Sequence, residues 1–306
     1  MVRQIVSALL KNTLPRAWVD AIRTARALPN RVTILERKLE LLAESQVREV
    51  YAPLLPQQED PAAFRQHEAK VYSQNGEDGL LLHLFATLGA PNRTFVEFGI
   101  GEGRECNTAN LSLNFGWRGL LMECSAERAA KARAFYRHRL GPDADRVNLV
   151  ETMVSPDNIN ELLRQHAPQG ELDLLSIDID GNDYWVWQAI TSSPRVVVVE
   201  YNAVFGPTRA ATVAFDPQFS RWDKHPSGLY FGASLAALAR LGAAKGYRLA
   251  GCDRHGVNAF FVREDIAGDI PALSPEAAYY VLHDHQLGLI GEERFAEISA
   301  LPFVDV

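Results

Sequence analysis

Residues 96–103 read Val-Glu-Phe-Gly-Ile-Gly-Glu-Gly, a β-forming run that ends in three glycines spaced two residues apart. A strand that ends in a glycine-rich turn lets the backbone approach a ligand closely, at the carboxyl end of the sheet where open α/β folds bind their ligands. The dinucleotide fingerprint needs its third glycine at position 104, which is Arg104 in this chain. The loop therefore argues against NAD or FAD as the ligand.

Short apolar strands alternate with helical stretches on both sides of this loop. The expected parallel strands are residues 93–99, 118–124, 147–154, 172–180 and 195–202. Because crossover connections place helices on both faces of a parallel sheet, this alternation predicts a doubly wound α/β fold. Residues 246–253 and 257–265 are two further expected strands, and the short connection between them indicates an antiparallel pair.

The composition of the 306-residue chain is that of a globular protein, with 47% hydrophobic and 23% charged residues. It excludes disordered, collagen-like and low-complexity chains. The formal net charge of -7 disfavours a general electrostatic surface for nucleic acid. Cys106, Cys124 and Cys252 lie far apart without a CxxC pair. Their spacing predicts neither a disulfide framework nor a structural zinc site, and it fits a reducing cytoplasm.

The N-terminal part differs in charge from the rest of the chain. Residues 1–31 carry six basic residues and one acidic residue, a net charge of +5. Such a basic amphipathic segment can lie on an anionic membrane surface, and the alternative is a pair of helices that packs on the domain or on a second subunit. Prolines at 53, 56 and 61 mark a linker. We therefore expect a helical segment over 1–55, for oligomerisation or membrane contact, and one α/β domain over 56–306.

A second element strengthens the interpretation of the glycine loop as a nucleotide site. Glu123 ends the next expected strand, twenty residues beyond Gly103. A carboxylate at this place can accept both hydroxyls of a ribose, as such residues do in nucleotide-binding α/β folds. A solvated strand end is the alternative, and the glycine loop in register makes it the weaker one.

The fourth expected strand ends in an acidic cluster that contains Asp178, Asp180 and Asp183. Carboxylates at a ligand-binding edge are costly unless they are paired or used, and they can hold a hard divalent cation or position a general base. Strand alternation places Asp178 and Asp180 on one face. Asp183 is expected to cap the helix that follows. Glu200 and Asn202 end the fifth expected strand at the same sheet edge.

Four stretches, in this order, resemble the class I S-adenosylmethionine-dependent methyltransferases: FVEFGIGEG, LLMEC, LLSIDIDGNDYW and VVVVEYN. The stretch SIDIDGND resembles in particular the FkbM-like branch, many of whose members O-methylate sugars or polyketides. That branch usually carries glutamate before the glycine, where this chain has Asp180. The resemblance covers roughly residues 70–265 and implies a Rossmann-like sheet of seven strands, mostly parallel with an antiparallel last strand.

The resemblance also implies where the cofactor S-adenosylmethionine would lie. Its methionine part would lie against Glu97, Gly99 and Gly101, at the end of the first expected strand. Its ribose would bind Glu123, and Asp178 would lie beside the methyl group that is transferred.

Three further segments would complete this pocket. The polar stretch 73–78, SQNGED, often lines the pocket in this family, which assigns Gln74 and Glu77 to it. A helix N-terminus rich in caps and acids is the alternative for that stretch. Asn107 opens the helix after the glycine loop, where free N–H groups could meet the cofactor carboxylate. By position alone, residues 152–154 would neighbour the adenine ring.

An insertion over about 203–234 separates the fifth and sixth expected strands and is rich in aromatic residues and in Asp, His and Arg. Long ordered insertions in a compact domain are usually lids or binding loops. Aromatic faces mixed with polar groups suit a polyhydroxylated ring, and anchoring of the loop is the alternative role. The candidate acceptor contacts are Asn202, Trp222, Asp223 and Tyr230.

Methyl transfer to a hydroxyl requires an aligned acceptor and the removal of its proton. His225, the histidine of the insertion, could act as the base near pH 7. The alternative is a magnesium ion held by Asp178 with Asp180, Glu200 or Asn202, which would polarise a sugar diol. Both arrangements use the same cleft.

The sequence therefore predicts an S-adenosylmethionine-dependent O-methyltransferase that acts on a sugar hydroxyl of a glycan or of a glycosylated small molecule. The alternatives are a non-sugar acceptor and a catalytically silent scaffold in a surface-polysaccharide assembly. Nucleic acid is not expected as a partner, because the Asn- or Asp-Pro-Pro-aromatic tetrapeptide of base N-methyltransferases is absent.

No apolar run approaches the roughly 20 residues that span a bilayer. We expect a cytoplasmic protein, peripheral to the inner face of the membrane if residues 1–31 bind there, and a homo-oligomer if they bind a second subunit. Residues 277–301, after the last expected strand, are expected to form one or two helices.

Overall fold

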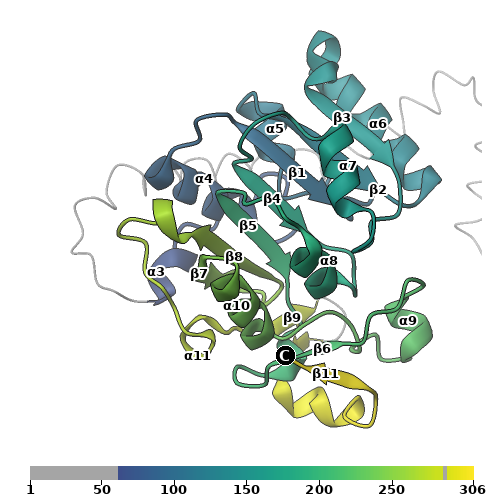
Figure 1. Ribbon diagram of the computed structural model, residues 1–306, viewed down its shortest axis with the longest axis vertical. Helices are drawn as coiled ribbons and strands as arrows, with labels where there is room; N and C mark the ends of the chain where they lie inside the picture. The colour runs from purple at the N-terminus through teal and green to yellow at the C-terminus, as the bar shows by residue number, and fades with distance from the viewer. Residues whose placement is uncertain (1–60, 285–287) are drawn as a thin grey trace, which may run out of the picture. The chain divides into compact units, whose positions relative to one another are not determined.

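The computed structural model describes residues 61–284 and 288–306 (Figure 1). The expectations for residues 1–55, which concern helices, membrane contact and self-association, lie outside the described residues. None of the helices within the described ranges combines the length and the apolar character that crossing a membrane requires.

A seven-stranded sheet with the order β3-β2-β1-β4-β5-β8-β7 forms the middle layer of the domain (Figure 1). β1 to β5 are parallel, and β8 runs antiparallel to both of its neighbours, β5 and β7. The predicted α/β fold is confirmed. The strands are β1 Thr94–Phe98, β2 Arg118–Glu123, β3 Val147–Glu151, β4 Leu174–Ile177, β5 Val196–Glu200, β7 Tyr247–Cys252 and β8 Asn258–Arg263.

Both faces of the central strands are buried, as a parallel sheet between two helical layers requires. Successive residues of β1 alternate between two hydrophobic cores, because side chains along a strand point to opposite faces. Phe95 belongs to the core under α4, α5 and α6. Val96 and Phe98 belong to the core under α7, α8 and α10.

Among the described residues, three of the longer helices cover each face. The first group is α4 Glu77–Leu88, α5 Ala109–Asn114 and α6 Ala126–Leu140, and the second is α7 Ile159–His166, α8 Asp183–Ala189 and α10 Leu235–Ala244. Two 3-10 helices and one short α-helix complete this part of the chain: η2 Gly141–Arg146, η4 Glu264–Ile266 and α3 Pro61–Arg65.

We expect one or two helices over 277–301, and the described helical residues there are the end of a four-residue α-helix and a six-residue 3-10 helix. The described part of this region forms short elements, because its apolar side chains pack on the insertion instead of forming a continuous helical face. The elements of the insertion are η3 Ala203–Phe205, β6 Ala211–Val213 and α9 Arg221–Lys224. Those of the C-terminal region are α11 Pro275–Ala278, β9 Leu282–Asp284, β10 Gly288–Ile290, η5 Glu292–Glu297 and β11 Phe303–Asp305.

The insertion and the C-terminal region share a third hydrophobic core. β11 pairs antiparallel with β6, so the end of the chain lies beside the insertion (Figure 1). The ring of Phe303 lies 5.2 Å from those of Phe205 and Tyr230 and 5.5 Å from that of Phe295, measured between centroids. The C-terminal strand therefore stabilises the insertion in one conformation.

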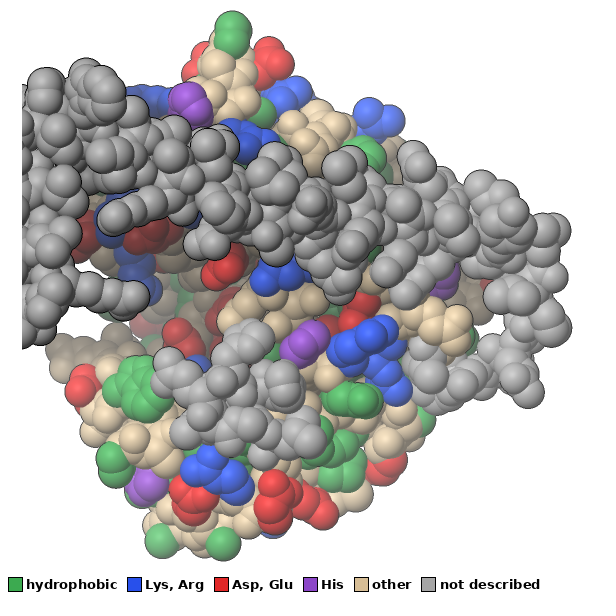
Figure 2. Space-filling model, turned by 180° about the vertical axis from the view of Figure 1, so that it is seen from behind, with side chains coloured by type: hydrophobic (Ala, Val, Ile, Leu, Met, Phe, Trp, Pro, Cys, Tyr) green, Lys and Arg blue, Asp and Glu red, His purple; other side chains and the backbone are tan. Residues whose placement is uncertain are grey.

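Charged side chains on the surface are often paired with the opposite charge. Lys131 Nζ lies 2.8 Å from Glu102 and 2.9 Å from Glu127. On the face shown in Figure 2, acidic and basic side chains lie among uncharged and hydrophobic ones. Exposed pairs of this kind contribute little to stability, because solvent and salt screen them.

Replacing Phe303 by alanine is expected to lower the free energy of unfolding by about 2 kcal/mol, because a half-buried aromatic ring leaves the third core. Limited proteolysis should then cut within 203–234 faster than in the wild type. Phe115→Ala is the control, since this ring is 46% exposed and its loss should change stability by about 0.5 kcal/mol or less. Equal protease resistance of the Phe303 variant and the wild type would show that the C-terminal strand does not hold the insertion.

Candidate functional site

Polar side chains form a row on one face of the sheet, at its carboxyl edge. Glu97 of β1 is in register with Ser176 of β4, and Glu200 of β5 is in register with Asn258 of β8. Strand alternation turns all four toward the α4, α5 and α6 layer, since residues two positions away, such as Phe95, lie in that core. The N-terminal ends of α4 and α5 lie over this row.

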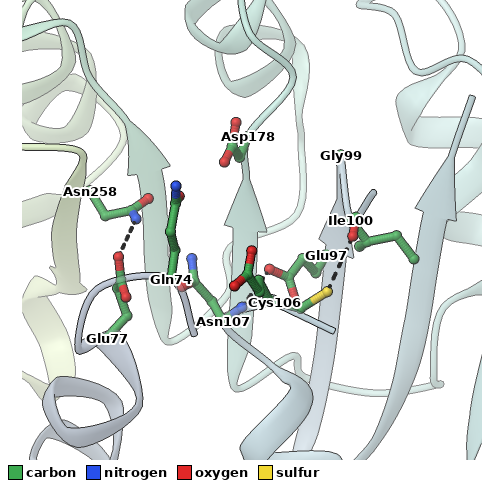
Figure 3. A pocket seen from close by; sticks show the side chains of 10 residues that line it. Gln74, Glu77, Glu97, Gly99, Ile100, Cys106, Asn107, Asp178 and Asn258 are labelled. Atoms are coloured by element: carbon green, nitrogen blue, oxygen red, sulfur yellow. Dashed lines mark hydrogen bonds between the residues drawn. The ribbon is translucent and has the colours of Figure 1, made fainter. Parts of the chain in front are cut away.

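A polar cavity opens at this row (Figure 3). It brings together six predicted cofactor residues, Gln74, Glu77, Glu97, Gly99, Asn107 and Asp178. Its other lining residues are Ile100, Glu105, Cys106 and Asn258, which the sequence analysis missed. The lining thus contains four carboxylates and, among the described residues, no lysine or arginine. This surface favours a positively charged ligand.

The glycine loop has the backbone that its sequence predicts. Gly99, Gly101 and Gly103 have φ angles of 81°, 56° and 73°, in the left-handed region that favours glycine. A Cβ atom on Gly99 would lie 1.4 Å from the carbonyl oxygen of Asp178, so the end of β1 touches the turn after β4. A Cβ atom on Gly101 would meet no described atom within 4 Å, which leaves room for a ligand.

Glu123 holds the glycine loop against the end of β2. Its carboxylate accepts hydrogen bonds from the backbone N–H groups of Gly101 at 2.8 Å and Ser125 at 2.9 Å. Its Oε1 also accepts the weak thiol donor of Cys124 at 3.6 Å. Oε2 keeps a lone pair for one ribose hydroxyl, and a second hydroxyl would replace the thiol on Oε1. Glu123 and Gly101 are not among the residues that line the polar cavity, and they lie on its β2 side.

Glu97 is buried, and its carboxylate accepts hydrogen bonds from backbone N–H groups just before α5. It accepts hydrogen bonds from the N–H groups of Asn107 and Thr108, both at 2.9 Å, and from the Thr108 hydroxyl at 2.5 Å. Burial raises the pKa of this carboxyl, and these bonds partly oppose the rise. The two N–H groups expected to be free for a cofactor carboxylate are therefore bonded to Glu97. The side chain of Asn107 remains in the cavity wall and donates to Ser176 at 3.1 Å.

The polar stretch 73–78 is held in its conformation by hydrogen bonds from its backbone N–H groups to its own acidic side chains. Asp78 accepts hydrogen bonds from the backbone N–H groups of residues 71–73. Burial raises the pKa of its carboxyl to about 6. Glu77 accepts the N–H groups of Asn75 and Gly76 at 2.8 Å and the side-chain amide of Asn258 at 2.9 Å. The stretch is thus an acid-rich helix start that also lines the cavity, so both interpretations of it apply.

Asp178, Asp180 and Glu200 each place a carboxylate oxygen within 4.8 Å of the others. Strand alternation does not place Asp178 and Asp180 on one face, contrary to expectation, because β4 ends at Ile177 and Asp180 adopts a left-handed φ of 59°. The turn itself brings the acids together. Burial, followed by repulsion from neighbouring carboxylates, raises the pKa of Asp178 and Glu200 well above the usual range.

Two buried oxygens at this edge have no hydrogen-bond partner among the described residues, Glu200 Oε2 and Asn258 Oδ1. Their residues are 8% and 4% exposed. A buried acceptor without a donor is unfavourable, so both oxygens are suited to a ligand that donates hydrogen bonds.

Asp183 does not cap α8, contrary to expectation. The residue at the N-cap position is Asn182, and buried Asp183 accepts the N–H groups of Ile179 at 2.8 Å and Gly181 at 2.9 Å. Its carboxylate therefore stabilises the turn of residues 178–183, here called the acidic turn, and does not cap the helix. Burial raises its pKa to about 6.

The insertion docks on this acidic turn through Arg221. Its guanidinium lies 2.8 Å from Asp180 Oδ1, donates to the carbonyl of Gly228 at 2.9 Å and lies 3.9 Å from the ring centroid of Phe231. Asn182 adds a bond to the carbonyl of Asp216 at 2.8 Å. The insertion thus borders the edge of the sheet where the carboxylates gather.

The predicted acceptor and base residues are spread over the insertion. The Asn202 amide donates to the carbonyls of Leu229 and Phe231 at 2.8 and 2.9 Å, so it anchors the loop. The hydroxyl of buried Tyr230 donates to the carbonyl of Pro302, and Tyr230 lines a separate groove of about 270 Å³ between insertion and C-terminal region. These contacts match the anchoring alternative for both residues.

Three residues of α9 and the turn after it remain at the surface of the insertion. Trp222 is 64% exposed, and Asp223 is exposed as well. Half-buried His225 pairs its Nδ1 with the hydroxyl of Ser227 at 2.7 Å. None of the three is among the lining residues of the polar cavity. Met153, of the stretch 152–154 that we expect near an adenine ring, is 60% exposed.

Comparisons with known proteins give only distant likeness. No family model and no curated protein matches the sequence. Similar solved structures include magnesium protoporphyrin IX methyltransferase from Synechocystis PCC 6803 with bound SAM, 12% identical over 61% of this chain and 77% of that chain (TM-score 0.41). Cofactor-bound Rv0187 from MTB is 19% identical over 74% of this chain and 88% of that chain (TM-score 0.42). An O-methyltransferase from Bacillus cereus in complex with SAH is 18% identical over 72% of this chain and 97% of that chain (TM-score 0.39). The fold assignment rests on the strand order of this chain itself.

Gly99→Ala and Gly101→Ala form a matched pair that tests the loop geometry. Both impose a left-handed φ on a Cβ-bearing residue, which costs about 1–2 kcal/mol. Gly99→Ala adds a clash with the backbone of Asp178, so its total loss should reach about 4 kcal/mol or more, measured by urea unfolding. Similar losses for the two variants would contradict the close approach of β1 to the acidic turn.

Proposed function

We propose that the protein is an S-adenosylmethionine-dependent methyltransferase that transfers a methyl group to a sugar hydroxyl, in a glycan or a glycosylated small molecule. The observation that carries this proposal is the cavity of Glu77, Glu97, Glu105 and Asp178 beside the left-handed glycine loop. S-adenosylmethionine carries a sulfonium and an ammonium charge, which suit a partly buried wall of carboxylates. Ligands dominated by phosphate would be repelled by the same wall.

The cofactor would extend along the carboxyl edge of the sheet. Glu123 would accept the ribose hydroxyls with its remaining lone pairs, next to the open side of Gly101. The methionine part would continue past Gly99 into the polar cavity, where Gln74, Glu77 and Asn107 line the wall. This arrangement directs the sulfonium toward Asp178.

The proposed reaction removes charge from a partly buried site. The hydroxyl oxygen of the acceptor attacks the sulfonium methyl, the C–O bond forms as the C–S bond breaks, and the electron pair of that bond stays on sulfur. The proton of the hydroxyl passes to Asp178, whose pKa is raised by burial and whose carboxylate lies within 4.8 Å of that of Glu200. A cation and a carboxylate thus become a neutral thioether and a carboxylic acid. Low dielectric favours this loss of separated charges.

A sugar acceptor is supported by the insertion beside Asp178. Exposed Trp222 offers an apolar ring face, and exposed Asp223 offers a hydrogen-bond acceptor. Arg221 connects their helix to the acidic turn through Asp180. An apolar face next to polar groups suits a ring that carries hydroxyls on its edge.

Magnesium is the competing arrangement. The carboxylates of Asp178, Asp180 and Glu200 lie close enough to share a divalent ion, and buried Glu200 Oε2 has no described partner. Against this, the guanidinium of Arg221 already pairs with Asp180 at 2.8 Å. We therefore favour proton transfer to Asp178 over a metal-bound acceptor.

Calorimetric titration with S-adenosylhomocysteine tests the cofactor. We expect micromolar binding by the wild type and a loss of about tenfold or more in Glu123→Ala, because charge-assisted hydrogen bonds to the ribose disappear. Glu102→Ala is the control, since Glu102 is an exposed acid of the same loop that pairs with Lys131. Absence of binding by folded wild type would favour the catalytically silent scaffold.

The proton acceptor is tested by turnover with a sugar acceptor found by screening methyl transfer from labelled S-adenosylmethionine. Asp178→Asn should lower kcat by about a hundredfold or more. His225→Ala should change kcat by less than about twofold, because His225 is not among the residues that line the cavity of Asp178. Turnover should also persist in EDTA. A loss in EDTA that magnesium restores would replace the proton transfer by metal-assisted chemistry.

A further inference from the structure

The amide of Asn258 is held in one orientation in the wall of the polar cavity. Its Nδ2 donates to Glu77 Oε1 at 2.9 Å. A carboxylate bonded to its neighbours can only accept, so the nitrogen rather than the oxygen of the amide faces Glu77. Asn258 Oδ1 is therefore turned away from Glu77 (Figure 3).

This oxygen lacks a partner within the described part of the chain although Asn258 is only 4% exposed. The cavity that it lines is continuous with Gly99 and Ile100 of the glycine loop. Asn258 stands at the start of β8, in register with Glu200 of β5. The antiparallel strand thus contributes an unsatisfied acceptor to a cavity that the parallel strands build.

We propose that Asn258 is a specificity-determining residue of the cofactor site, whose Oδ1 accepts a hydrogen bond from the α-ammonium group of S-adenosylmethionine. This inference rests on the proposed function. Three groups of the cofactor donate hydrogen bonds strongly: the ribose hydroxyls, the adenine amine and the ammonium. Glu123, on β2, is placed for the ribose, and β2 lies four strands from β8 in the sheet.

The charge of the cavity selects the ammonium. Glu77, Glu97 and Asp178 surround the approach to Asn258. An ammonium carries three donors and one positive charge, so it satisfies Asn258 Oδ1 and is attracted by the carboxylates at the same time. The carboxylate of the amino acid offers acceptors alone and cannot satisfy this oxygen.

The test compares two ligands by calorimetry on the full-length protein: S-adenosylhomocysteine and its analogue with hydrogen in place of the α-amino group. The wild type should bind the analogue about tenfold or more weakly. Asn258→Ala should lose a similar factor for S-adenosylhomocysteine and bind the analogue within about twofold of the wild type. Asn107→Ala is the matched control, because it removes another amide of the wall and should affect both ligands alike.

A double variant keeps the test decisive if Asn258→Ala does not fold. In Asn258→Asp/Glu77→Gln the hydrogen bond between the two residues persists with its direction reversed, and a charged acceptor faces the cavity. Affinity for S-adenosylhomocysteine should be retained or rise, and discrimination against the analogue should increase. Thermal unfolding identifies the folded variants.

Equal losses for both ligands in Asn258→Ala, or unchanged affinity for S-adenosylhomocysteine, would overturn the ammonium contact and leave the proposed function intact. If the folded wild type binds neither ligand, the proposed function fails, and this inference fails with it.

Discussion

The close approach of Gly99 to the carbonyl of Asp178 is the constraint on which the site depends. No side chain fits between the end of β1 and the turn after β4. The glycine loop and the acidic turn are therefore neighbours, although about eighty residues separate them in the chain. A ligand bound along the backbone of the glycine loop would therefore lie next to Asp178. This contact joins the part of the site that would bind the cofactor to the part that would take the proton.

Most buried acids of the site are structural, and their hydrogen bonds show it. Glu97, Asp78 and Asp183 each accept two or more backbone N–H groups, so they hold the segments that surround the cavity. Glu200 and Asn258 lie at the sheet edge, and each keeps a buried oxygen without a donor among the described residues. Asp78 also keeps such an oxygen, Oδ1, but its Oδ2 accepts hydrogen bonds from three backbone N–H groups. Acids that shape the cavity can thus be separated from the acceptors that it offers to a ligand.

The third hydrophobic core gives the insertion its own support. Phe303 and its neighbours from the C-terminal region pack against the insertion, and Arg221 connects the insertion to the acidic turn through Asp180. The surface that carries Trp222 is therefore positioned by two contacts distant in sequence. The insertion is thus a loop segment supported by a rigid α/β frame.

The sequence by itself determined the sheet, the glycine loop and the acids at the strand ends, because strand period, glycine spacing and strand-end position are local signals. It also indicated Glu97, Gln74 and Asp178, three residues that the fold brings to one cavity. Tertiary structure alone decided the rest. Asn258 enters the cavity because β8 inserts antiparallel between β5 and β7. Residues 288–306 pack on the insertion as short strands and one 3-10 helix. Such contacts join segments far apart in the chain, and no local pattern of residues encodes which distant surfaces will meet.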